Sequence, residues 1–267
     1  MLAVYAIRIS PPTRSGLALS IMSVGAPLGF AFGTPLGALI GELSDWRWSF
    51  AGLSGVAFVA AAIAVIWLPD ASGQVPTTRR PLKSVFGIRG VPLVLLVILV
   101  WMLAHSTIYT YVAPYLRATE TGITPDLMLL VYGVASLLGV GITGVYLDRH
   151  PRALLHITAT AFVLAGVVLL VGHSSGSAII IAATLWGLSF GGAPSQLQNA
   201  LTRAGEDSSD VANSFLPVAF NLAIFAAGVF GALVLVAFDG LVLPIAMAAL
   251  GVIVVALTIY GRRSAFA

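Results

Sequence analysis

This chain has no cysteine, a single lysine and very little charge of either sign. Without cysteine there is no disulfide framework, no thiolate metal site and no cysteine nucleophile. Charged residues make up 9% of the 267 positions, whereas a soluble domain carries about 25%. Hydrophobic residues make up 59%, and the mean hydropathy is +1.02. A water-soluble core cannot bury this much apolar surface, so the composition predicts an integral membrane protein.

The sequence also lacks the residue patterns that enzymes use. It contains no H-E-x-x-H zinc motif, no G-x-S-x-G elbow and no phosphate-binding P-loop. None of the long apolar runs has Asp or Glu near its middle, so no pair of carboxylates is placed for acid–base catalysis. We therefore expect no enzyme activity, no cofactor and no metal site.

The apolar residues gather in runs long enough to cross a hydrocarbon core of ~30 Å, which needs about 20 helical residues. These runs are approximately 17–41, 49–68, 92–115, 127–147, 153–172, 178–199, 212–238 and 241–261. Residues 1–9 are apolar but too short to span, and resemble the end of a further helix. The sequence therefore predicts an all-α integral membrane fold with about eight transmembrane helices.

Basic residues are divided unequally between the two ends of these helices. The side holding both termini and the connections 69–91, 148–152 and 200–211 carries eleven of the 13 basic residues: Arg8, Arg14, Arg79, Arg80, Lys83, Arg89, Arg149, Arg152, Arg203, Arg262 and Arg263. The other side carries Arg47 and Arg117. By the positive-inside rule the first side, with the C-terminus, is cytoplasmic. The same thin spread of arginine argues against nucleic-acid binding, although the pI is near 9.5.

Glycine recurs at every fourth position in the first run, which also holds Pro35. The ladder consists of Gly25, Gly29, Gly33, Gly37 and Gly41. Positions four apart share a helix face, and small residues there let a second helix approach closely. We expect this face to be a sliding seam between two halves of the protein; generic small-residue packing is the alternative. The expected partner is the run 127–147, through Gly133, Ser136, Gly139 and Gly144.

Residues 69–91 form the longest polar break, rich in proline and basic side chains. They predict a cytoplasmic linker between an N-terminal remnant at 1–68 and a six-helix unit at 92–267; a basic amphipathic strip on the membrane surface is the alternative. A shift of the chain by 194 residues lays the first run on the seventh, so that Gly37 falls on Gly231. Internal repeats of this kind are typical of transporters.

Four stretches resemble the major facilitator superfamily, within its sugar-efflux and drug:proton antiporter group. They are GFAFGTPLGA at 29–38 with WRWSF at 46–50, HSTIYTYVAPY at 105–115, GVYLDRHPR at 144–152, and WGL at 186–188 with Gln196 to Asn199 and Asn221. The resemblance implies a partial major-facilitator-type helical bundle, without the first three helices and most of the fourth. The missing helices would come from upstream sequence or a partner chain.

The resemblance also implies a function: an efflux permease of a bacterial inner membrane that moves sugars or drugs by alternating access. Its partners would be a small-molecule substrate, the lipid bilayer and, if transport is coupled, protons. A carboxylate proton relay would then lie in the missing helices, because the runs here lack one. The alternative is a transport-incompetent truncated or regulatory membrane protein.

Several polar residues within the runs are candidates for a substrate cavity, because intramembrane polar side chains usually face a cavity or the bundle interior. They are His105, Tyr109, Tyr111, Gln196 and Asn221. The alternative is hydrogen bonding between helices, which contributes about 0.6 kcal/mol per bond on average.

The loop after the run 127–147 carries Asp148, Arg149 and Arg152. The carboxylate can pair with either arginine at a helix end. By resemblance, this loop latches against the start of the run 212–238, near Ser208 to Asn213, when the cytoplasmic side is closed. A simple topology-setting charge cluster is the alternative.

Overall fold

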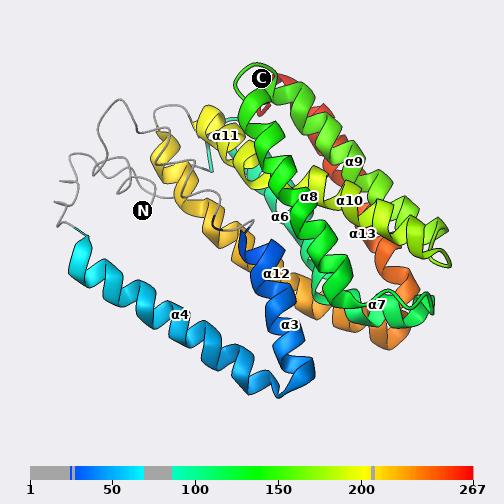
Figure 1. The fold of residues 1–267 in the computed structure, drawn as a ribbon. Coiled ribbons are helices and arrows are strands. Elements are labelled where there is room, and N and C mark those ends of the chain that lie inside the picture. Colours follow the sequence, from blue (N-terminus) through cyan, green and yellow to red (C-terminus); the bar gives the residue numbers. More distant parts are fainter. Residues whose placement is uncertain (1–24, 26–27, 69–85, 206–207, 267) are drawn as a thin grey trace. The chain divides into compact units, whose positions relative to one another are not determined.

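A computed structural model of the chain describes residues 25, 28–68, 86–205 and 208–266 (Figure 1). The chain divides into two units, Met1–Arg79 and Arg80–Ala267, whose boundary falls within the predicted linker 69–91. Every regular element within the described ranges is a helix, as the sequence predicts for an all-α protein.

The described part of the first unit contains a π-helical turn, η2 (Gly29–Gly33), followed by α3 (Thr34–Leu43) and α4 (Trp46–Trp67). Pro35 lies in the first turn of α3 and has no backbone N–H to donate. The wider η2 turn therefore precedes a residue that could not continue the α-helical bond pattern. Asp45 caps α4, since its carboxylate accepts a hydrogen bond from the Arg47 backbone at 2.8 Å.

A side-chain bond joins the two helices of this hairpin. The Ser49 hydroxyl of α4 donates to the Gly37 carbonyl of α3 at 2.7 Å. Otherwise α4 is apolar on all sides, and none of its residues is buried within the described part of the chain. A helix with apolar side chains all round is stable in lipid but not in water.

The second unit is a bundle of the remaining helices (Figure 1). Its elements are α6 (Val91–Thr110), α7 (Val112–Thr119), α8 (Pro125–Tyr146), α9 (Pro151–Val171), α10 (Gly176–Gly191), α11 (Ala193–Gly205), α12 (Ser209–Ala237), η4 (Gly240–Val242), α13 (Leu243–Tyr260) and η5 (Gly261–Arg263). Two predicted runs are interrupted: 92–115 breaks at Tyr111, and 178–199 breaks at Gly192.

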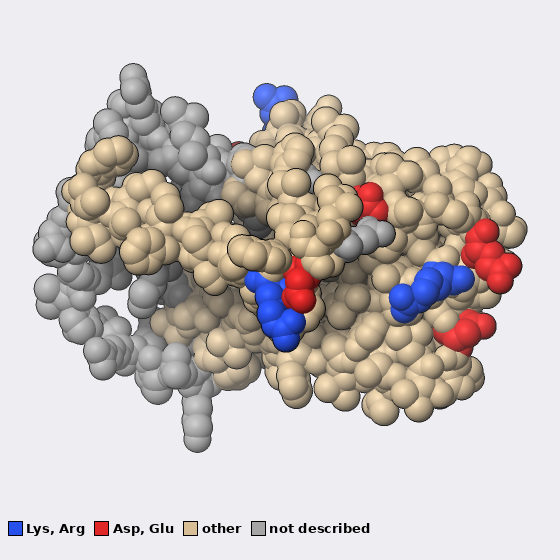
Figure 2. All heavy atoms as spheres, turned by 60° about the horizontal axis from the view of Figure 1, so that its bottom comes forward, with Lys and Arg blue, Asp and Glu red and all other residues tan. Residues whose placement is uncertain are grey.

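Seven of the described helical segments are long and apolar enough to cross a membrane. They match the predicted runs from 49–68 onward. The run 17–41 lies partly outside the described residues, and its described part forms η2 and α3. Among the described residues drawn in Figure 2, Lys, Arg, Asp and Glu appear only at scattered places. This chain is therefore a multi-pass membrane protein with a partial helical bundle.

Glycines bring α8 and α10 close together in the second unit. A methyl group at Gly187 or Gly191 would overlap the backbone of Tyr132 or Ser136, and one at Gly139 would lie 2.5 Å from the Leu188 carbonyl oxygen. We call this contact the α8–α10 seam. Ser136 and Gly139, two of the four residues predicted to receive the glycine ladder, face α10 in this unit, whereas Gly144 is open; the pairing of α8 with the ladder stays a prediction.

The last described residues close one end of the bundle. Ala265 and Phe266 are buried, and the Phe266 carbonyl accepts a hydrogen bond from Arg152 Nε at 2.8 Å. Gly90, just before α6, has φ of 103° and lies under the Ser264 carbonyl, where a Cβ would not fit. This C-terminal segment, residues 261–266, thereby ties the start of α6 to the start of α9.

Candidate functional site

His105 lies in α6 and is almost fully buried, with 2% of its surface exposed. Its ring stacks on the Phe190 ring, with centroids 3.6 Å apart and an angle of 6° between the planes. The indole Nε1–H of Trp186 donates a hydrogen bond to His105 Nδ1 at 3.1 Å. The imidazole is thus fixed by α10 both at its face and at its edge.

Two tyrosines complete a group that we call the aromatic cluster: His105, Tyr109, Tyr132, Trp186 and Phe190. The Tyr132 and Trp186 ring centroids are 4.4 Å apart, and the Tyr109 ring lies 5.4 Å from the His105 ring. Tyr132 and Trp186 are fully buried, whereas Tyr109 is half-buried. Tyr109 is therefore the member of the cluster that reaches the surface of the unit.

The helices explain why these rings meet. His105 and Tyr109 are four residues apart on α6, as are Trp186 and Phe190 on α10, so each pair shares a helix face. Tyr132 comes from α8, and the α8–α10 seam lets the two backbones approach closely enough for its ring to reach Trp186. The glycines of the seam therefore position the cluster.

Tyr111 stands at the break between α6 and α7 and binds a different neighbour. Its hydroxyl donates to the Gly228 carbonyl of α12 at 2.6 Å. Its ring lies against Gly231, where a Cβ would overlap it. Tyr111 therefore holds α12 to the α6–α7 corner.

Gln196 is buried on α11 and joins three helices. Its Oε1 accepts from the Thr158 hydroxyl of α9 at 2.9 Å, and its Nε2 donates to Thr143 Oγ1 of α8 at 3.1 Å. It lies ten residues beyond Trp186, about 15 Å along the helices at 1.5 Å per residue. The structure thus places Gln196 away from the aromatic cluster.

Asn221 is exposed on α12, and its amide donates to the Pro217 carbonyl of the same helix at 2.8 Å. Of the five cavity candidates, the structure brings together only His105 and Tyr109. Tyr111, Gln196 and Asn221 each bind elsewhere, and the substrate-binding role of all five stays a prediction.

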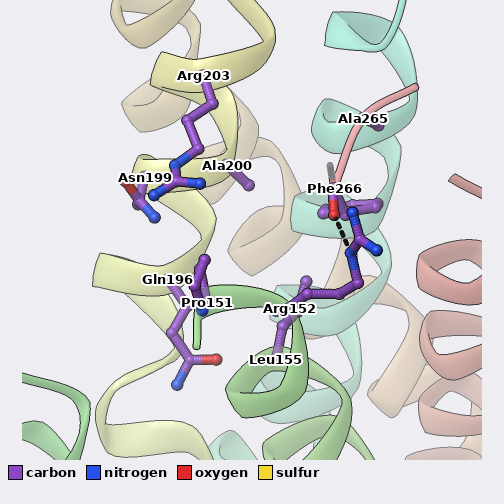
Figure 3. A pocket seen from close by; sticks show the side chains of 9 residues that line it. All are labelled: Pro151, Arg152, Leu155, Gln196, Asn199, Ala200, Arg203, Ala265 and Phe266. Carbon is purple, nitrogen blue, oxygen red and sulfur yellow. Dashed lines mark hydrogen bonds between the residues drawn. The ribbon is translucent and has the colours of Figure 1, made fainter. Parts of the chain in front are cut away.

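The loop after α8 holds the charged candidates. Asp148 and Arg149 are exposed, and in the described part of the chain no ion pair joins Asp148 to Arg149 or to Arg152. Arg152 instead binds Phe266 beside a small pocket of about 20 Å³, which has room for one water molecule. Figure 3 shows that this pocket also receives Gln196 and Arg203 from α11. The gating role of the loop stays a prediction.

The amino-acid sequence of this chain matches a known protein family. A sequence profile of the Major Facilitator Superfamily matches residues 1–228. The chain belongs to the Major Facilitator Superfamily.

Members of the superfamily with curated names resemble this chain at modest identity. A protein of Helicobacter acinonychis (strain Sheeba), named "Probable sugar efflux transporter", is 27% identical over 233 residues. A protein of Helicobacter pylori (strain P12) with the same name is 28% identical over 240 residues. In both cases the match covers 86% of this chain and 59% of the relative, so the chain spans about three-fifths of their length.

The glycine ladder of this superfamily member is open where it is described. No atom lies within 4 Å of a Cβ built at Gly25, Gly29, Gly33 or Gly37. Only Gly41, with Ser49 Oγ 3.7 Å from such a Cβ, has a neighbour there. The ladder's role as a sliding seam, with that of Pro35, stays a prediction.

Some residues around the candidate sites carried no signal in the sequence. Tyr132 and Phe190 enclose His105, and Thr143 and Thr158 bind Gln196. None of these residues stands out in an apolar helix. Their contacts depend on how each helix is oriented about its axis, which is seen only in the folded unit. Trp186, by contrast, belongs to a stretch that carries the superfamily resemblance.

Proposed function

We propose that this chain forms part of an efflux permease that moves small organic solutes, with sugars as the first substrate class. Membership in the superfamily supports transport, and the names of the relatives point to sugar efflux. The transport cycle would be alternating access, in which helices separate on one side of the membrane while they close on the other.

The aromatic cluster is the observation that carries the substrate class. Small-molecule sites are lined mainly by apolar and aromatic side chains with a few placed polar groups. Here flat rings are combined with tyrosine hydroxyls and an imidazole, which suit the apolar faces and the hydroxyls of a sugar. A solute would meet half-buried Tyr109 first and the buried rings as the helices separate.

Coupling to protons would depend on other parts of the transporter. In the described spans, Asp and Glu lie only near the ends of the helices. An example is Asp126, in the first turn of α8. An intramembrane carboxylate relay would have to come from segments outside these spans.

The proposed location is a bacterial inner membrane with the C-terminus in the cytoplasm. Because the chain has no native cysteine, single-cysteine variants report one site each. A membrane-impermeant maleimide should label Thr124→Cys, before α8, in intact cells, and Arg149→Cys, after α8, only in opened cells. Labelling in the reverse pattern would contradict the proposed orientation.

Transport in everted membrane vesicles tests the function. Radiolabelled mono- and disaccharides are offered to the 267-residue chain and to the longer form that upstream DNA encodes, if it continues the reading frame. Tyr109→Ala should weaken the apparent affinity about tenfold, as expected for loss of an aromatic contact of about 1.4 kcal/mol, and Asn221→Ala should also weaken it. Tyr260→Ala, at a tyrosine that is 82% exposed, is the control.

Two results would overturn the proposal. Unchanged affinity in both variants would exclude the predicted cavity. If neither form transports any sugar, sugar efflux is excluded, and the alternative of a transport-incompetent truncated or regulatory membrane protein is favoured.

A further inference from the structure

We propose that Trp186 is a positioning residue that fixes the tautomer of His105, with the ring proton on Nε2. The Nε2–H of His105 then serves a solute as a hydrogen-bond donor. The imidazole does not take up a second proton while α6 and α10 stay packed. The solute-binding part of this inference rests on the proposed function, whereas the tautomer can be measured without any transport.

The hydrogen bond between the two side chains determines the tautomer. An indole N–H can only donate, so the Nδ1 atom that receives it at 3.1 Å must present a lone pair. A neutral imidazole has a single ring proton, which must therefore lie on Nε2. Nε2 becomes the donor of the pair and Nδ1 the acceptor.

Adding a second proton would break this arrangement. In an imidazolium ion both ring nitrogens are donors, so Nδ1–H and the Trp186 N–H would point at each other. The titratable groups around the ring are Tyr109 of α6 and Tyr132 of α8, while α10 contributes the rings of Trp186 and Phe190. None of these described rings carries a carboxylate that could stabilise the cation.

A second buried tryptophan provides a matched comparison. Trp101 lies one helical turn before His105 on α6, is fully buried, and packs edge-on against Phe190 with centroids 6.2 Å apart. Its Nε1 has no hydrogen-bond partner among the described residues. Both tryptophans are thus fully buried among aromatic rings, but Trp101 packs on Phe162 and Phe190, whereas Trp186 bonds to the imidazole.

Nitrogen NMR of the full chain in lipid nanodiscs measures the tautomer directly. The chain has four histidines, so ¹⁵N-histidine labelling gives four ring systems, and His105→Gln identifies the His105 signals by their loss. We expect His105 to show a protonated Nε2 and an unprotonated Nδ1 at pH 7.5 and also at pH 5. A proton on Nδ1, or an imidazolium at pH 5, would overturn the proposal without any variant.

The variants then test whether Trp186 is the cause. Trp186→Phe removes the N–H and keeps an aromatic ring, so both neutral tautomers should appear at pH 7.5. Trp101→Phe should leave the His105 spectrum as in the wild type. Size-exclusion profiles and helical circular dichroism show whether each variant is folded, and a folded Trp186→Phe with a wild-type spectrum would refute the assignment.

Transport separates a donor from a proton carrier. Glutamine at 105 supplies an N–H donor but cannot be protonated, whereas leucine supplies neither function. His105→Gln should keep sugar transport within about threefold of wild type, the size of one average interhelical bond, and His105→Leu should lose it. If His105→Gln is as inactive as His105→Leu, His105 carries protons. If the wild type itself transports nothing, the proposed function fails, and the NMR result still decides the tautomer.

Discussion

Two sets of glycines in this chain look alike in sequence and differ in structure. The ladder from Gly25 to Gly37 has the regular four-residue spacing, yet a Cβ at these positions would meet no atom within 4 Å in the described structure. In the α8–α10 seam, Gly139, Gly187 and Gly191 are less regularly placed, and each lies directly against the backbone of the facing helix. Glycine spacing therefore indicates that another helix can approach closely. Only the position of a neighbouring backbone shows that a helix does approach there.

This difference assigns separate roles to the two sets. The seam positions Tyr132 against Trp186 and so builds the aromatic cluster. The ladder contributes one carbonyl, Gly37, to the α3–α4 hairpin and otherwise remains a candidate contact surface. If the two sets differ in this way, substitutions in the α8–α10 seam should lower stability more than substitutions in the ladder.

Gly191→Ala should have the largest effect. The added methyl group would overlap the Ser136 backbone, which cannot move as a flexible side chain can. Overpacking of this kind costs about 1–3 kcal/mol, seen as a lower midpoint of thermal unfolding in detergent. Gly144→Ala, on α8 with open space around it, is the control and should keep the wild-type midpoint. Equal midpoints in the two variants would mean that the seam is loose.

Gln196→Leu should have an intermediate effect on the same unit. It removes two bonds between helices, to Thr143 and Thr158, worth about 1 kcal/mol together at 0.6 kcal/mol each. Asn221→Leu is the matched control, because the Asn221 amide binds within its own helix. A larger loss in unfolding free energy for Asn221→Leu would contradict the view that polar bonds join the bundle at Gln196.

Gly33→Leu should have the smallest effect on stability. With no described neighbour to clash with, the larger side chain should lower the free energy of unfolding by less than about 0.5 kcal/mol. If the ladder is the proposed sliding seam, the same variant should still reduce sugar transport in vesicles. Normal transport would leave the ladder as a lipid-facing surface, whereas a large loss of stability would show that it is packed like the α8–α10 seam.

The sequence predicted what depends on composition and length. Long apolar runs with few charges give the spans, and seven of them are helices in the described residues. The breaks at Tyr111 and Gly192 were missed, because a hydropathy run continues across a single residue that leaves the helix. In lipid a break is tolerated when its backbone groups stay bonded, as at Tyr111, whose N–H donates to the Thr107 carbonyl at 3.3 Å and whose carbonyl accepts from the Tyr115 N–H at 3.2 Å.

The candidate site was predicted only in part, for a geometric reason. His105 and Tyr109 share a helix face, so their proximity followed from spacing alone. Whether His105 faces Trp186, or Gln196 faces Thr158, depends on how helices are rotated about their axes. Along α6 and α10 apolar residues occur on every side, so no amphipathic pattern sets the rotation that brings His105 to Trp186, and packing decides it.

The C-terminal segment has a consequence for the order in which the protein is made. Ser264 covers Gly90, and Phe266 packs beside Gly261 and binds Arg152, so the first turn of α6 is completed by residues that the ribosome adds more than 170 positions later. Chains fold from the N-terminus as they are synthesised. The contacts of Gly90 and Arg152 with this segment therefore form only after residues 261–266 have been synthesised.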